Sequence, residues 1–381
     1  MKRALVIIVL IASLAAMFWW SSSRTGKPSD AKTRIGVLMP LSGSVAEPGK
    51  KCLEGIELAV SQFNKLHSDH TVTLVIEDSK AESPFALSAV QKLINVDKVP
   101  AIIGDLTSSV SMSVSPVTEK AQIILFSPGA SHPKFIGVGS HTFRIWVSDN
   151  YDGEVMASYL SQDRKLTRGA VLYVNNDYGA GLAGVFKERF QQKGGQIAYY
   201  EGYAVGMTDF RPIIAKLSAI PSLEFIYLPG NPKENAFFVQ QAQELPLKTL
   251  LAANLSVEND DFKKGAGQAM KGIIFSSPAF DPTRPTLDGK PFATAYGSVN
   301  QHEPDIASAH GYDAALALLT AWKNAGFDWA ATPAAIVALK NLQGVTGTTS
   351  FTPTGDVAKA ILIKQLQADG TATIIKEIPV Q

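Results

Sequence analysis

The segment Thr33-Arg34-Ile35-Gly36-Val37-Leu38-Met39 favours a β-strand, and with the residues that follow it decides the class of fold. From Gly49 to Leu66 the apolar side chains recur at the spacing of an α-helix. The apolar residues of the strand are contiguous rather than alternating, as expected for a parallel strand covered by helices on both faces. The pattern therefore predicts an α/β fold built on an open parallel sheet.

The same alternation of strand and helix continues outward along the chain. Further strands of a first series are predicted at residues 71–76, 101–104 and 122–126, with helices between them. The alternation then restarts, with strands predicted at residues 168–174, 196–203, 223–228 and 248–252. Two such series predict two similar lobes with a cleft between them. Ligands of these sheets bind at the carboxyl ends of the strands.

The last quarter of the chain departs from this alternation. Residues 280–291 are rich in Pro, Asp and Thr, which predicts a surface loop. A long helix is predicted from Ile306 to Ala325. Residues 359–366 and 371–378 are predicted to form a β-hairpin around Ala368-Asp369-Gly370.

The N-terminus has the pattern of a secretory signal. Met1-Lys2-Arg3 is basic, Ala4 to Trp20 carries no charge, and residues 21–28 are polar. A predominantly apolar stretch of this length, 17 residues, is also at the lower limit for a membrane-spanning helix. Residues 1–24 are therefore expected to be a cleaved signal peptide or an uncleaved membrane anchor. In both cases the rest of the chain lies in the periplasm or outside the cell, with this segment as its only membrane contact.

Bulk composition narrows the class of protein further. The 381 residues carry a net charge of +1, and charges of both signs are dispersed, so nothing indicates a nucleic-acid partner. The length exceeds what one hydrophobic core usually holds, which predicts two domains. Cys52 is the only cysteine, so no internal disulfide can form. It shares a helical face with Ile56, Ala59 and Phe63, as a buried core residue would.

No constellation of catalytic residues is recognisable. There is no nucleophile elbow, phosphate-binding loop or paired-cysteine metal site, so no catalytic residue, cofactor or metal is expected and a hydrolase is remote. Gly179-x-Gly181-x-x-Gly184 has the spacing of a dinucleotide loop, but a helix start explains it better, because no acidic residue closes the next strand. His67 and His70 lack a third metal ligand and are expected to lie at a solvated helix end.

Small hydroxyl and glycine residues follow two neighbouring strands. Gly104 to Ser109 lies between a predicted strand and a helix, and Ser127-Pro128-Gly129-Ala130-Ser131 follows the next strand. Free backbone N–H groups at a helix start, together with serine hydroxyls, can bind a carboxylate. Spacing alone leaves two interpretations of Ser108 and Ser109 open: a ligand site, or ordinary helix caps.

An ordered set of short motifs spans most of the chain. Besides the segments 37–43, 103–109 and 127–131, it comprises Phe143-Arg144-Ile145, Asn176-Asp177-Tyr178-Gly179, Thr208-Asp209-Phe210 and Gly311-Tyr312-Asp313-Ala314. From residue 33 to 381 the sequence resembles the type I periplasmic binding proteins of the leucine/isoleucine/valine-binding family, which supply ABC importers.

This resemblance implies two Rossmann-like lobes, joined by three crossovers, that hinge shut on a small-molecule ligand in the interlobe cleft. It places one lobe at residues 33–145 plus 279–347 and the other at residues 146–278 plus 348–381. The expected role is delivery of a carboxylated solute to the permease subunits of an ABC transporter. A membrane-anchored sensory module of the same fold is the alternative, because fold alone does not separate the two.

The resemblance also implies roles for individual residues. Ser108 and the backbone of Gly129 are expected to hold the ligand carboxylate, and Ser131 to receive its ammonium. Tyr178 is expected to close over the ligand from the second lobe. Leu106 and Asn231 are expected to help shape the pocket.

Three positions depart from the family pattern. Asn254 stands where an acidic residue usually completes the ammonium site, and Pro48 and Ala307 stand where two aromatic residues shape the pocket. Glu47 could supply the missing acid, in which case the ligand is an amino acid, branched-chain or bulkier. If Glu47 points to solvent, a carboxylate without an ammonium is expected instead. We favour the amino acid, because Ser131 and Tyr178 are retained.

Overall fold

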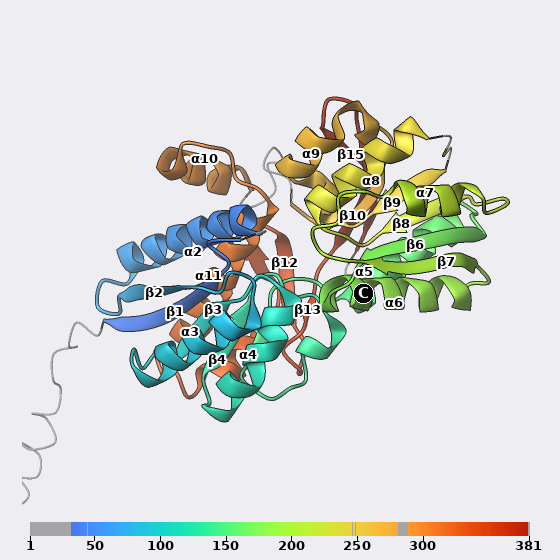
Figure 1. Ribbon diagram of the computed structural model, residues 1–381. Helices are drawn as coiled ribbons and strands as arrows, with labels where there is room; N and C mark the ends of the chain where they lie inside the picture. Colours follow the sequence, from blue (N-terminus) through green and yellow to red (C-terminus); the bar gives the residue numbers. More distant parts are fainter. Residues whose placement is uncertain (1–31, 44, 246, 248, 281–288, 380–381) are drawn as a thin grey trace, which may run out of the picture.

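The computed structural model describes residues 32–379 except 44, 246, 248 and 281–288, and it shows two α/β lobes (Figure 1). The predicted signal peptide or anchor, residues 1–24, lies outside the described residues. Among the helices that are described, none combines the length and the apolar character needed to cross a membrane.

The sheet of the first lobe is parallel throughout and has the order β2-β1-β3-β4-β5. Its strands are β1 (Thr33–Met39), β2 (Val72–Asp78), β3 (Ala101–Gly104), β4 (Ile124–Ser127) and β5 (Thr142–Arg144). The helices between them are α2 (Ala46–Leu66), α3 (Ser83–Asn95) and α4 (Ser108–Lys120). The strand predicted at 33–39 is confirmed to the residue.

Helices cover both faces of this sheet, which is why its strands are continuously apolar. α2 packs on one face beside α11 (Ile306–Asn324), whereas α3 and α4 cover the other. The helices α2 and α11 approach each other closely at two glycines. A Cβ atom on Gly55 would lie 2.0 Å from the Ser308 carbonyl oxygen, and one on Gly311 would lie 2.1 Å from that of Cys52. The Cys52 thiol is free and fully buried, as predicted.

The second lobe holds a seven-stranded sheet with the order β15-β14-β10-β9-β8-β6-β7. Its first five strands along the chain are β6 (Arg168–Val174), β7 (Gln196–Tyr203), β8 (Phe225–Leu228), β9 (Leu250–Ala253) and β10 (Ile274–Pro278). The surrounding helices are α5 (Asp149–Ser158), α6 (Asp177–Gln192), α7 (Arg211–Ser218), α8 (Pro232–Glu244) and α9 (Asp260–Ala266). α5 and α6 cover one face and the other three helices the opposite face.

The C-terminal hairpin was predicted correctly: β14 (Ile361–Leu366) pairs antiparallel with β15 (Ala372–Ile378). The hairpin joins the seven-stranded sheet through β10. Residues 342–358, just before the hairpin, do not join this sheet. A small antiparallel sheet is formed by β11 (Leu342–Gly344), β12 (Gly347–Phe351) and β13 (Val357–Ala358). Phe351 and Val357 are buried in the core of the first lobe, so residues 348–358 do not pack on the second lobe as the boundary at 348 expected.

The remaining elements are helical. α10 (Gly289–Asn300) occupies part of the expected loop at 280–291, of which residues 281–288 are not described. α12 (Thr332–Ala338) packs beside α11. The 3-10 helices are Pro133–Phe135, Leu255–Glu258 and Gly267–Met270, and a π-helical turn spans Tyr159–Asp163.

Candidate ligand-binding site

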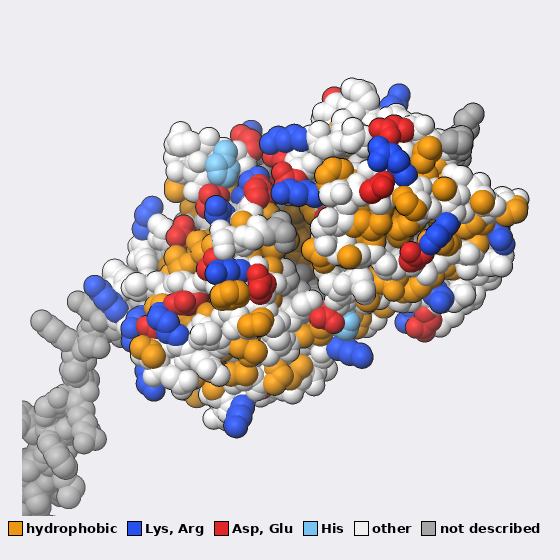
Figure 2. All heavy atoms as spheres, viewed as in Figure 1, with side chains coloured by type: hydrophobic (Ala, Val, Ile, Leu, Met, Phe, Trp, Pro, Cys, Tyr) orange, Lys and Arg blue, Asp and Glu red, His pale blue; other side chains and the backbone are white. Residues whose placement is uncertain are grey.

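Two adjoining cavities, of about 460 and 330 Å³, are lined by residues of both lobes. Both are lined by Pro48, Leu106, Gly129, Trp146, Tyr178, Asn231 and Leu255. We treat them as the outer and inner parts of one cleft: the larger is the outer cavity, and the smaller, which reaches Ser108 and Ser131, is the inner cavity. Figure 2 shows the surface hollowed between the lobes, with charged side chains at its upper rim.

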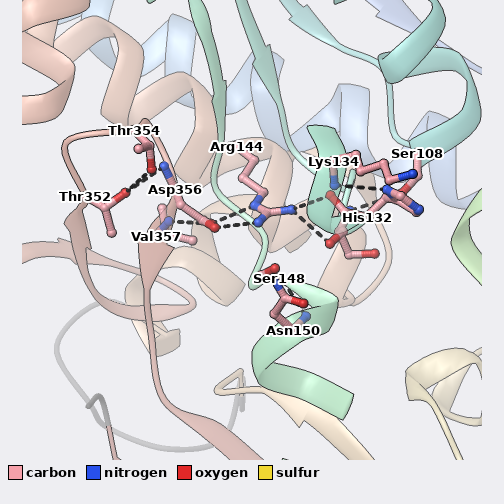
Figure 3. Close-up of polar contacts among 11 residues, drawn as sticks. Ser108, His132, Lys134, Arg144, Ser148, Asn150, Thr352, Thr354, Asp356 and Val357 are labelled. Carbon is pink, nitrogen blue, oxygen red and sulfur yellow. Dashed lines mark hydrogen bonds and ion pairs between the residues drawn. The ribbon is translucent and has the colours of Figure 1, made fainter. Parts of the chain in front are cut away.

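The inner cavity begins at the N-terminus of α4. Thr107 is the N-cap residue, but its side chain donates to Asp105 Oδ1 (2.8 Å) and forms no capping bond. Ser108 is buried, and its Oγ accepts hydrogen bonds from the backbone N–H groups of Ser131 and His132, both at 3.2 Å (Figure 3). Ser108 is therefore not a helix cap. A hydroxyl with both acceptor positions occupied retains only its proton, which it can donate.

Asp105 holds the ends of the two strands that carry this site. Its carboxylate accepts from Ser79 Oγ at 2.5 Å and from the Thr107 backbone at 2.7 Å. Its backbone carbonyl accepts from Ser127 Oγ at 2.6 Å. Burial raises the pKa of Asp105 to about 6, against the lowering effect of these hydrogen bonds. The network fixes the loops after β3 and β4 relative to each other.

Gly129 and Ser131 lie in the loop after β4 and line the inner cavity. A Cβ atom on Gly129 would lie 2.4 Å from the Leu106 carbonyl oxygen, so only glycine allows this approach of the two loops. The Ser131 carbonyl accepts from Arg144 Nη1 and from the Asp149 backbone N–H, each at 2.9 Å. The Ser131 hydroxyl is buried and close enough to Asp149 to lower the pKa of that carboxyl, but it forms no hydrogen bond of ordinary geometry.

Tyr178 enters the cleft from the first turn of α6 and meets Asn254. Asn254 Nδ2 donates to Tyr178 Oη at 2.5 Å and to the Gly230 carbonyl at 3.1 Å. Asn254 Oδ1 accepts from the Gly230 N–H at 3.2 Å and from Ser256 Oγ at 2.7 Å. All four hydrogen-bonding positions of the amide are thus filled. Asn254 lines the cleft, but its side chain is used to position Tyr178. The structure therefore does not support the expected contact between Asn254 and a ligand ammonium.

Glu47 lies at the rim of the cleft and lines neither cavity. Its carboxylate is 2.8 Å from Lys51 Nζ and accepts from Asn259 Nδ2 of the second lobe at 3.3 Å. The side chain is 42% exposed, so Glu47 does not replace the acid that is missing at Asn254. Of the expected pocket-shaping residues, Pro48, Leu106 and Asn231 line both cavities and Ala307 lines the outer one.

The cleft residues that were not found from the sequence include Trp146, Asp149 and Asp152. They follow β5, where the chain crosses to the second lobe. Trp146 packs on His310, with ring centroids 4.1 Å apart. Burial raises the pKa of Asp149 to about 8 and that of Asp152 to about 6.

Within the described residues, the Gly179-x-Gly181-x-x-Gly184 pattern and the His67/His70 pair have structural roles. Asn176 Oδ1 caps α6 by accepting from the Gly179 N–H at 2.8 Å, as the helix-start interpretation predicted. His70 stacks on Phe327, with ring centroids 3.7 Å apart. Among the described residues, no group of three or more His, Cys, Asp or Glu side chains could hold a metal ion.

Comparison with known proteins agrees with this architecture. The chain is 28% identical over 328 residues to an amino acid binding protein of Pseudomonas aeruginosa, covering 85% of this chain and 87% of that one. It is 25% identical over 347 residues to the leucine-, isoleucine-, valine-, threonine- and alanine-binding protein of the same organism, covering 90% and 92%.

Solved structures extend the comparison. A leucine-binding protein from Thermotoga maritima superposes with a TM-score of 0.84 at 25% identity, covering 91% of this chain and 99% of that one. A solute-binding protein from Rhodopseudomonas palustris, in complex with 3,4-dihydroxybenzoic acid, gives 0.82 at 19% identity, covering 93% and 99%, a similarity of fold alone. Residues 32–371 match the model of the periplasmic binding protein family. The chain belongs to that family.

Proposed function

We propose that this protein binds a small carboxylated solute in the interlobe cleft, outside the cytoplasm, and delivers it to the permease of an ABC importer. We expect the solute to be an amino acid. The observation that carries the proposal is the state of Ser108. Its hydroxyl is occupied as an acceptor by the N–H groups of Ser131 and His132. It can therefore act toward a ligand only as a donor.

The surroundings of Ser108 favour an anionic acceptor. The first N–H groups of α4 have no partner within the helix and carry its positive end. Thr107, Ser108 and Ser109 line the inner cavity at this point. A carboxylate would receive both the Ser108 hydroxyl and the helix N–H groups. These groups stabilise no neutral apolar solute.

Three crossings of the chain between the lobes support closure by a hinge. The polypeptide crosses between them after β5, after β10 and between β13 and β14. Leu106 and Gly129 belong to the first lobe and Tyr178 and Asn231 to the second, so a ligand in the cleft contacts both. The names of the relatives support an amino acid, whereas a neighbour of the same fold holds a hydroxylated benzoic acid. The fold therefore does not choose the ligand.

A thermal-shift screen tests the proposal. Amino acids, their deaminated acids and their amides would be added to the purified mature protein. We expect stabilisation by at least one carboxylate and none by the corresponding amide, such as leucinamide for leucine. Equal stabilisation by acid and amide would contradict a carboxylate site. Retention of the full-length chain in the cytosolic fraction of its host would contradict the extracytoplasmic role.

A further inference from the structure

Buried polar atoms without partners gather at the base of the inner cavity. Among the residues that the structure describes, such atoms are Ser131 Oγ, Asp149 Oδ2, Asp152 Oδ1, Tyr227 Oη and Ser276 Oγ, together with three elsewhere. Ser131, Asp149 and Asp152 line the cavity itself. Tyr227 and Ser276 belong to β8 and β10, and the charges of both carboxyls act on the Tyr227 hydroxyl. The Ser131 hydroxyl acts on Asp149 and the Ser276 hydroxyl on Asp152, but none of the five atoms forms a hydrogen bond of ordinary distance and angle. Buried polar groups are hydrogen-bonded as a rule, so this cluster indicates a missing polar partner.

An ordinary helix start does not explain this pair of acids. Asp149 and Asp152 are in the first turn of α5, where acidic residues favourably meet the helix dipole. Helix-start acids are normally solvated, however, and Asp149 is only 1% exposed. Ser148 already caps the helix by accepting from the Asn150 N–H. The two carboxyls are therefore not needed as caps. Asp152 as a whole is half-buried, but its Oδ1 is buried like the Asp149 carboxyl, and this burial requires another reason.

Among the described residues, no cation forms an ion pair with either acid. The charge of Arg144 acts on Asp149, but its guanidinium donates to Asp356 and to the carbonyls of Ser131 and His132. Neither Asp149 nor Asp152 forms an ion pair within the described part of the chain. Burial accordingly raises the pKa of both carboxyls. A positive group in the inner cavity would meet two acids that have no ion-pair partner among the described residues.

The acids and the carboxylate clamp share one small space. Ser108, Ser131, Asp149 and Asp152 all line the inner cavity of about 330 Å³. The Ser131 N–H is bonded to Ser108, whereas the Ser131 hydroxyl lies beside Asp149. Donors for an anion and acceptors for a cation are thus adjacent, as a zwitterion requires. Of the residues expected to meet the ammonium, Asn254 and Glu47 are bonded elsewhere.

We propose that Asp149 and Asp152, together with the Ser131 hydroxyl, bind the ammonium group of the ligand, which makes the solute an amino acid rather than a simple carboxylic acid. This inference rests on the proposed function, because it places the carboxylate of the same solute at Ser108. Tyr178 covers the ammonium from the mouth of the cavity. It stays neutral there, because burial and the charges of both acids hold its pKa well above the usual value.

The test compares matched ligands on matched variants. Dissociation constants would be measured by calorimetry for leucine against 4-methylpentanoate and for phenylalanine against 3-phenylpropanoate. The proteins are wild type, Asp149→Asn, Asp152→Asn and the control Asp177→Asn. Asp177 is an exposed acid at the start of α6 that lines neither cavity. We expect each cleft variant to weaken amino-acid binding by at least about thirtyfold, as for breaking a buried charge pair.

The deaminated acids should bind wild type weakly and change by less than about threefold in these variants. Deaminated acids that bind wild type as tightly as amino acids would overturn the inference and leave the proposed function standing. So would an amino-acid preference retained by both cleft variants. If neither series binds, the proposed function fails and the inference with it. Either Asn variant suffices if the other does not fold, and the melting temperature without ligand shows which is folded.

Discussion

Arg144 and Asp356, 212 positions apart, form a two-bond ion pair that ties the first interlobe crossing to the third (Figure 3). Nε donates to Oδ1 at 2.7 Å and Nη2 to Oδ2 at 2.6 Å, while the Arg144 side chain has no exposed surface. Nη1 donates to the carbonyls of Ser131 and His132 at 2.9 and 3.1 Å. One guanidinium therefore fixes the hinge and the ligand-binding loop together.

Asp356→Ala should destabilise the protein strongly. The substitution leaves a buried guanidinium without its counter-ion, which costs about 3–5 kcal/mol of the free energy of unfolding. Asp163→Ala is the matched control, because it breaks the pair of Asp163 with Lys376, in which both side chains are about 40% exposed. That change should cost at most about 1 kcal/mol. Urea unfolding measures both, and equal losses would contradict a special role for the buried pair.

Ser108→Ala should weaken the binding of a carboxylate by about 1.5–3 kcal/mol, because it removes a hydrogen bond to a charged group. It should also lower the stability of the unliganded protein by about 1–3 kcal/mol, since the N–H groups of Ser131 and His132 lose their acceptor. Ser113→Ala, on the same helix but outside both cavities, serves as the control. Loss of stability with unchanged affinity would show that Ser108 is only structural.

Asn254→Ala and Tyr178→Phe should act as one unit in ligand binding. Asn254 positions the Tyr178 hydroxyl, so removing either partner removes the same hydrogen bond. Each variant should weaken binding by about 1 kcal/mol, and the double variant should fall short of the sum by about 0.5–1 kcal/mol. A double-mutant cycle measured by calorimetry provides the numbers. Strict additivity would mean that Asn254 does not act through Tyr178.

Glu47→Gln should have little effect on ligand binding. Glu47 is partly exposed, lines neither cavity and pairs with Lys51 and Asn259 at the rim. Exposed pairs contribute about 0–1 kcal/mol, so affinity should change by less than about fivefold. Abolished binding would instead place Glu47 on the ligand and remove the need for Asp149 and Asp152.

The fold was predictable because its signals are local. Contiguous apolar strands such as Thr33–Met39, each followed by a helical pattern, specify a parallel sheet wherever they occur. The third sheet was missed for the opposite reason. Phe351 packs against Phe126, more than 200 positions earlier, and the short strands around it carry no periodicity that reveals this contact.

The site was predictable only where motif position decides it. Ser108, Gly129, Ser131 and Tyr178 follow strands and were expected in the cleft, where the structure places them. The hydrogen bonds of Asn254 were not predictable, because they depend on Gly230 and on the side chain of Tyr178. Asp149 and Asp152 were not predictable either, because two acids three residues apart after a strand are also typical of an ordinary helix start.

Stability without ligand should fall as the pH rises from about 4 to 8, and Asp149 should cause much of the fall. Burial raises the pKa of Asp149 from 3.8 to about 8, so the folded protein retains a proton that the unfolded chain has lost. The stabilisation is complete below the unfolded pKa and is lost as the pH passes through the folded one. One such proton gives a slope of up to about 1.4 kcal/mol per pH unit.

Asp149→Asn should abolish this slope, most clearly between pH 6 and 8, because Asp152, with a pKa raised to about 6, titrates mainly below that range. Arg144, His132, Tyr178 and Tyr227 also face the pair, and their contributions largely cancel in the difference between variant and wild type. Urea unfolding at pH 5, 6, 7 and 8 measures that difference, with Asp177→Asn as the control that should keep the slope. Parallel pH profiles for wild type and Asp149→Asn would mean that Asp149 is already ionised in the unliganded cleft. The two carboxyls would then have to find their partner in the protein rather than in the ammonium of an amino acid.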